Sequence, residues 1–183
     1  MSDSPLNRRA FLRIGTLSLL ALPSFATSTS GAFLKAQPRS LSFNNLHTAE
    51  KLSAVYWAEG DYIPESLNEI NRILRDYRSG EICEIEPRLL DTLCALRMRL
   101  ETAEPFELIS GYRSPTTNAM LRSQGHSVAE NSLHLKGMAV DVRIPGRSLA
   151  LLRRTAISLK AGGVGYYPAS QFVHIDIGRV RTW

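Results

Sequence analysis

The stretch Ser132-Leu-His-Leu-Lys-Gly-Met-Ala-Val-Asp141 predicts a turn followed by a strand. Gly137 permits the turn, because glycine adopts left-handed backbone angles without the steric cost that other residues meet. Residues 138–144 then alternate apolar and polar side chains with the period of a half-buried strand. His134 and Asp141 would lie on opposite faces of one strand, or roughly 10.5 Å apart along one helix. We therefore expect Asp141 on the open face of the strand and His134 on the loop that leads into it.

The stretch Phe172-Val-His-Ile-Asp176 alternates in the same way and predicts a second strand. His174 and Asp176 would point to the same side, roughly 6.6 Å apart along the strand. Two such strands could present His134, Asp141 and His174 to one metal ion and leave a fourth position open, as catalytic zinc requires. A lone histidine on a strand is more often an ordinary polar residue, so the residues alone leave both interpretations open.

These two stretches follow Ser110-Gly-Tyr-Arg-Ser114 and enclose the run Ala161-Gly-Gly-Val-Gly-Tyr-Tyr-Pro168. In order and spacing, the motifs resemble the D-Ala-D-Ala carboxypeptidase-like (LAS-type) zinc peptidases, a group that includes the Hedgehog zinc domain. Within that group the chain most resembles the murein endopeptidase K type. The resemblance covers about residues 47–183 and is specific, because several motifs occur together in the same order.

The resemblance implies a zinc site with one ion per chain, held by His134, Asp141 and His174. It also implies that Arg113 holds a substrate carbonyl or carboxylate and stabilises the oxyanion of the transition state. His126 is not expected to be a ligand, because a fourth protein ligand would close the open position. Further substrate contacts are expected from Ser114, Ser132 and Tyr166, with Tyr167 as the alternative to Tyr166.

The general base is the point at which the chain departs from the family pattern. Many members carry a Glu, Asp or His two or three residues before the last ligand, where this chain has Gln171 and Phe172. Asp176 is the nearest titratable residue by strand geometry, and we name it as the base. The alternative is that Asp176 orients the imidazole of His174 without taking a proton from substrate.

The function that the resemblance implies is zinc-dependent hydrolysis of amide bonds in the stem peptides of peptidoglycan. The murein endopeptidase K type indicates an endopeptidase that acts on peptide cross-links, including those between two diaminopimelate residues. Two alternatives stay open: a D-Ala-D-Ala carboxypeptidase or dipeptidase, and a non-catalytic zinc-stabilised domain that binds the cell wall. We expect a monomer.

The N-terminus predicts an export signal over residues 1–26. Arg8-Arg9 is a twin-arginine pair, residues 14–25 are apolar, and Ser24-Phe-Ala26 resembles a small-x-small cleavage site. The apolar run is short for a membrane span, so we expect cleavage, no remaining membrane anchor and a periplasmic location, with an uncleaved anchor as the alternative. Removing three arginines and one aspartate lowers the formal net charge from +5 to about +3, and no basic patch interleaved with aromatic residues indicates a nucleic-acid partner.

Residues 27–42 are rich in Ser, Thr, Gly and Pro and predict a flexible linker, which leaves residues 43–183 as one domain. We expect an α+β fold, with a small, mainly antiparallel sheet that carries the zinc site on one face and is flanked by helices. Cys83 and Cys94 could form a disulfide in an oxidising compartment, or Cys94 could be a small core residue. Apolar periodicity and capping residues predict helices over 64–79, 87–102, 115–122 and 148–160.

Overall fold

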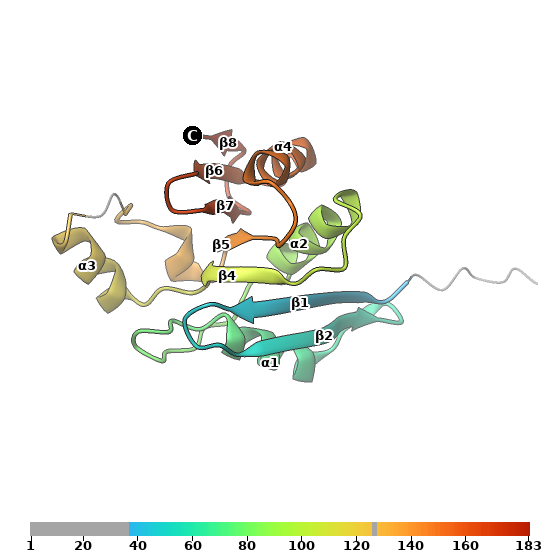
Figure 1. Ribbon diagram of the computed structural model, residues 1–183. Helices are drawn as coiled ribbons and strands as arrows, with labels where there is room; N and C mark the ends of the chain where they lie inside the picture. The colour runs from blue at the N-terminus through green and yellow to red at the C-terminus, as the bar shows by residue number, and fades with distance from the viewer. Residues whose placement is uncertain (1–36, 126–127) are drawn as a thin grey trace, which may run out of the picture. The chain divides into compact units, whose positions relative to one another are not determined.

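Eight strands form one sheet in the computed structural model, which describes residues 37–125 and 128–183 (Figure 1). The strands are β1 (Arg39–Asn45), β2 (Lys51–Ala58), β3 (Asp61–Tyr62), β4 (Phe106–Ser110), β5 (Ala139–Arg143), β6 (Gly163–Tyr167), β7 (Phe172–Asp176) and β8 (Arg181–Thr182). Their order across the sheet is β3-β2-β1-β4-β5-β7-β6-β8. The pairs β1–β4 and β6–β8 are parallel and the others antiparallel, so the mainly antiparallel sheet is confirmed, but it is not small.

The folded domain begins earlier than the sequence analysis placed it, because β1 starts at Arg39 inside the expected linker. Leu41 and Phe43 are buried and pair with Ala54 and Leu52 of β2, so the intervening polar residues of β1 are simply its outward face. The expected signal peptide and the linker up to residue 36 lie outside the described residues, and both stay predictions.

Four α-helices accompany the sheet in the part of the chain that the structure describes. They are α1 (Pro64–Ile73), α2 (Pro87–Arg99), α3 (Pro115–Ser123) and α4 (Leu149–Leu159). Helix α1 packs on β2, α2 on β1 and α4 on β6 and β7, so these three helices cover the core. Figure 1 shows α3 beyond the end of β4, away from the helices that cover the sheet. Ser114 and Ser148 cap α3 and α4 by accepting the backbone N–H of Thr117 and Leu151.

Helix α1 ends at Ile73 and not at the predicted Ser79, because tertiary contacts capture the chain after it. The carbonyl oxygen of Leu74 accepts the backbone N–H of Tyr112 at 2.7 Å. A Cβ on Gly111 would overlap that carbonyl oxygen, so glycine is needed for this close approach. Two residues on, buried Asp76 accepts the N–H of Ser114 at 2.8 Å. The segment that follows α1 is thereby hydrogen-bonded to the turn that carries Arg113.

Helix α2 also ends earlier than predicted, at Arg99 in place of Thr102. Glu101 has a positive φ of 47°, which is outside the helical region and stops the helix. Cys94 is buried on α2 and Cys83 is partly exposed, and both are free thiols, so Cys94 is a core residue. Within residues 37–125 and 128–183, no helix has the length and apolar character needed to cross a membrane.

Candidate metal centre

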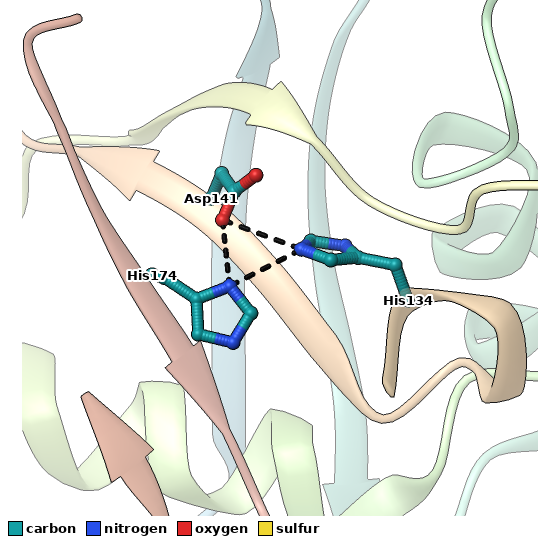
Figure 2. Close-up of side chains that lie close together, drawn as sticks. All are labelled: His134, Asp141 and His174. Atoms are coloured by element: carbon teal, nitrogen blue, oxygen red, sulfur yellow. Dashed lines mark hydrogen bonds and ion pairs between the residues drawn. The ribbon is translucent and has the colours of Figure 1, made fainter. Parts of the chain in front are cut away.

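Two neighbouring strands and one short helix bring the three expected ligands together. Asp141 of β5 lies directly opposite His174 of β7 in the antiparallel ladder, so their side chains share a face. His134 lies on the 3₁₀ helix η1 (Leu133–Lys136), which replaces the expected loop and ends at Gly137 with φ of 65°. Figure 2 shows the three side chains converging on one point. The predicted turn at Gly137 and the predicted strand placement of Asp141 are therefore confirmed.

The three ligand atoms form a closed triangle. His134 Nε2 lies 3.2 Å from His174 Nδ1 and 3.3 Å from Asp141 Oδ1. His174 Nδ1 lies 2.8 Å from Asp141 Oδ1. Tetrahedral zinc with bonds of about 2.0–2.1 Å separates its ligand atoms by about 3.3 Å. All three residues are at most 9% exposed, so the cluster has the spacing and the burial that a metal ion needs.

Hydrogen bonds on the far sides of the rings orient both histidines. His134 Nδ1 lies 2.6 Å from the carbonyl oxygen of Gly111, which can only accept, so this nitrogen carries the proton. Nε2 of His134 therefore turns a lone pair toward the cluster. In His174 the orienting nitrogen is Nε2, which lies 3.1 Å from Oδ2 of Asp176. When both rings are neutral in these tautomers, two imine nitrogens and a carboxylate oxygen face one another, an arrangement that a central cation stabilises.

Asp176 lies behind His174 and not in front of the cluster. Its exposed fraction is 0%, and its carboxylate also accepts the N–H groups of Gly163 and Gly178. The Arg181 guanidinium adds a salt bridge of 2.8 Å. Burial alone would raise the pKa of Asp176, but these hydrogen bonds, that of His174 first, hold its pKa well below its usual range. Asp176 is therefore an ionised carboxylate whose oxygens already accept hydrogen bonds from His174, Arg181 and two backbone N–H groups.

The electrostatics of the cluster favour positive charge at its centre. Burial opposes ionisation of Asp141, yet the adjacent His134 and His174 hold the pKa of Asp141 well below its usual range. Burial also opposes protonation of His174, but the carboxylates of Asp141 and Asp176 outweigh it and raise the pKa of His174 to about 8. Two anionic groups flanking two imidazoles are typical of a site for a divalent cation.

A cleft of about 410 Å³ opens over the cluster, and Arg113 lines it. Arg113 NH2 lies 3.8 Å from Asp141 Oδ2, and NH1 donates to Asn118 at 3.4 Å. Its Nε is buried and has no hydrogen-bond partner among the residues that the structure describes. Burial lowers the pKa of Arg113, and the charge of Asp141 partly restores it. Arg113 is thus a desolvated cation with unused donor capacity beside the cluster.

Residues 34–183 match a family model described as peptidoglycan L,D-endopeptidase MepK. The chain belongs to the MepK family. It is similar to the peptidoglycan L,D-endopeptidase MepK of Escherichia coli strain K12, with 45% identity over 97% of both chains. It is also similar to the probable peptidoglycan L,D-endopeptidase MepK of Haemophilus influenzae, with 38% identity over 97% of this chain and 95% of that one.

The residues expected to contact substrate do not all lie in the cleft. Ser132 lines the cleft, and its hydroxyl accepts the N–H of His134. Ser114 is fully buried and caps α3, so it does not face the cleft. Tyr167, and not the expected Tyr166, lines the cleft. The register explains this, because Tyr166 lies opposite core residue Val173 and so points to the other side of the sheet.

The cleft residues of this MepK-family chain that were not anticipated include Phe172, Arg181 and Trp183. Phe172 could have been found, because it alternates with His174 on the same strand. Arg181 begins the two-residue strand β8 and Trp183 follows it, and a strand this short carries no readable period, so no sequence signal placed them at the site. His126 lies outside the described residues.

Proposed function

We propose that this chain is a zinc-dependent peptidoglycan hydrolase, an endopeptidase that cleaves L,D amide bonds in the cross-links between stem peptides. The observation that carries the proposal is the closed triangle of His134, Asp141 and His174 at the floor of a cleft lined by Arg113. Membership of a family whose named relatives are peptidoglycan L,D-endopeptidases supplies the substrate class. The bond proposed is the one that joins two diaminopimelate residues.

His134, Asp141 and His174 would hold the zinc, with one ion per chain, because the described residues contain one cluster of this kind. Two imidazole nitrogens and one carboxylate oxygen are ligand types that zinc accepts, and three protein ligands leave one position for substrate chemistry. When bound there, zinc supplies a Lewis acid that polarises the scissile carbonyl and activates water for attack.

Arg113 would bind and stabilise charge on the substrate. Its side chain is 11% exposed, and the closest carboxylate contact of its guanidinium is 3.8 Å, too long for a hydrogen bond. A buried donor without a partner is costly, so a substrate oxygen that accepts from it gains a strong, charge-assisted hydrogen bond. Negative charge that develops on the carbonyl oxygen strengthens this bond, which favours the transition state over the ground state.

Asp176 would orient His174 and would not act as the general base. Its carboxylate is fully buried behind the imidazole, where substrate cannot reach it. Its lone pairs are taken by His174, Arg181 and the N–H groups of Gly163 and Gly178. Such a partner fixes the ring and raises the basicity of the ligand nitrogen. Among the described residues that line the cleft, only the three cluster residues carry a carboxylate or an imidazole.

Export by the twin-arginine route to the periplasm completes the proposal. It rests on Arg8-Arg9 and the apolar run of residues 14–25, together with the cell-wall substrate of the family. Because one chain supplies the whole cluster and cleft, we also propose that the enzyme works as a monomer. Replacing Arg8 and Arg9 with lysine should leave the protein in the cytoplasm, which fractionation would detect.

The direct test is digestion of purified sacculi by the protein with and without a chelator, followed by mass analysis of the released muropeptides. The proposal predicts loss of dimers cross-linked through two diaminopimelate residues, abolished by the chelator and restored by zinc. Trimming of terminal D-alanine alone would identify a carboxypeptidase. An intact, zinc-loaded protein that cleaves nothing would identify a wall-binding domain.

A further inference from the structure

The cleft over the cluster of His134, Asp141 and His174 is also lined by aromatic residues that have no role in the proposed reaction. Tyr167, Phe172 and Trp183 line it, and we call these three residues the aromatic wall. Trp183 is 45% exposed, which is high for a tryptophan that is held by several contacts. Arg113 and Ser132 line other parts of the same cleft, so a substrate there meets both cationic and aromatic surface.

The aromatic wall is held in place before substrate arrives. The rings of Tyr167 and Phe172 stack with centroids 4.7 Å apart and an angle of 21° between their planes. The indole N–H of Trp183 donates to the hydroxyl of Tyr167 at 2.7 Å. The guanidinium of Arg181 lies 4.8 Å from the indole centroid and is itself paired with Asp176. These contacts restrict the indole before substrate binds, so little conformational entropy of its side chain is lost when a substrate packs against it.

Gly165 provides the space in which the indole lies. A Cβ at this position would lie 2.7 Å from the indole ring, too close for any real side chain. Gly165 is opposite His174 in the ladder between β6 and β7, so the indole lies over β6 and beside the strand that carries His174. The ring centroids of Trp183 and His174 are 5.3 Å apart. The aromatic wall is therefore adjacent to the reacting atoms.

We infer that Trp183 determines substrate specificity, by packing against the aliphatic side chain of the diamino acid that flanks the scissile bond. An amide held at the cluster places the side chain of a flanking residue within reach of an indole 5.3 Å from His174. Methylene groups gain free energy when an aromatic ring removes them from water. The inference rests on the proposed function and names the substrate feature that the same site selects.

The kinetic test compares Trp183→Ala and Trp183→Phe with wild type on two cross-linked peptide dimers. One dimer carries diaminopimelate beside the scissile bond, and the other carries alanine there. Wild type should prefer the first dimer, since one methylene in an apolar pocket is worth about tenfold or more in kcat/KM. Trp183→Ala should lose most of that preference through a higher KM, and Trp183→Phe should retain part of it. Equal loss on both dimers would overturn the inference, because a merely structural role lowers both rates alike.

A binding test separates the inference from the proposed function, because the chain has only two tryptophans, Trp57 and Trp183. In Trp57→Phe the sole indole is Trp183. In the control variant Trp183→Phe the sole indole is Trp57, which lies on β2, at the other end of the sheet from β6 and β8. The ligand is L-Ala-γ-D-Glu-meso-diaminopimelate, with the same tripeptide ending in alanine as control. Neither tripeptide contains a cross-link to cleave, so binding is measured on the zinc-loaded protein.

The inference predicts that the diaminopimelate tripeptide changes the emission of Trp183 and not that of Trp57, and that the alanine tripeptide changes neither. No change in Trp183 at concentrations that inhibit the zinc-loaded enzyme would overturn the inference and leave the proposed function intact. A change in Trp183 in a protein that cleaves no cross-link would support the subsite and reject the endopeptidase.

Discussion

Nε2 of His174 lies 3.1 Å from Oδ2 of Asp176, whose carboxylate is completely buried on the side of the ring away from Asp141. This relationship places Asp176 where it can fix the imidazole but cannot reach substrate. It also connects His174, a proposed metal ligand, to β8, because Arg181 pairs with the same carboxylate oxygen at 2.8 Å.

Asp176→Asn tests the orienting role. The amide can still accept from His174 but carries no charge, so zinc affinity should fall about 10–100-fold. Titration with zinc, followed by activity at saturating zinc, measures both effects. Activity that largely returns once zinc is saturating supports the orienting role. Activity that stays about a thousandfold or more below wild type in a fully zinc-loaded, folded protein would instead make Asp176 the general base.

Arg113→Ala should lower kcat about 10²–10³-fold, the usual cost of removing one donor to a developing oxyanion. Zinc content and melting temperature should stay near those of wild type, because the polar contacts of the Arg113 side chain with the described residues are long, at 3.4 and 3.8 Å, and its backbone hydrogen bond to His134 is kept. Arg75→Ala, which removes a salt bridge with Glu50 away from the cleft, is the matched control and should keep its kcat. A higher KM with unchanged kcat would mean that Arg113 binds substrate without stabilising the transition state.

Gly137→Ala and Gly146→Ala form a matched pair, because both glycines have positive φ values, of 65° and 70°. A Cβ at Gly146 meets no atom within 4 Å, so this variant pays only the conformational cost of about 1 kcal/mol. A Cβ at Gly137 would overlap the carbonyl oxygen of Glu84. Thermal unfolding should therefore show a clearly larger loss for Gly137→Ala. Equal losses would show that the turn before β5 is not closely packed.

Asp76 makes stability depend on pH. Burial opposes its ionisation, but hydrogen bonds from Thr117, Ser114 and the N–H of Arg78 outweigh it and lower the pKa of Asp76 to about 2. Because the folded-state pKa lies below the unfolded value, the ionised carboxylate stabilises the fold above about pH 4. That contribution, on the order of 2 kcal/mol, disappears as the pH falls to about 2.

Urea unfolding of wild type and Asp76→Asn across this range measures the effect. The difference in unfolding free energy between the two proteins should be largest near neutral pH and should shrink between about pH 4 and pH 2. Asp61→Asn, on the exposed strand β3, is the control and should show little difference at any pH. A difference for Asp76→Asn that does not change with pH would mean that its charge does not stabilise the fold.

The alternating patterns made the site strands predictable. The period of two in residues 138–144 and 172–176 gave β5, β7 and the shared face of His174 and Asp176, since only one face of each can join the core. Serine caps located α3 and α4. These patterns depend on neighbouring residues alone, and they predict the structure correctly where tertiary contacts favour the same conformation.

Non-local contacts decided what the sequence could not show. Helix α1 stops because Leu74 and Asp76 bind the turn of residues 111–114, about 40 residues away. Trp183 reaches the cleft only because β8 adds to β6 in parallel. The carbonyl oxygen of Gly111 that orients His134 is a backbone group, and no residue type signals it. Each of these depends on pairings between distant segments.

The central claim is that His134, Asp141 and His174 hold one zinc ion, and anomalous diffraction at the zinc absorption edge tests it most directly. Crystals grown with zinc should show one anomalous peak per chain, about 2.0–2.2 Å from His134 Nε2, His174 Nδ1 and a carboxylate oxygen of Asp141. A peak coordinated by other residues, or no peak at this cluster in an otherwise ordered and active protein, would contradict the account.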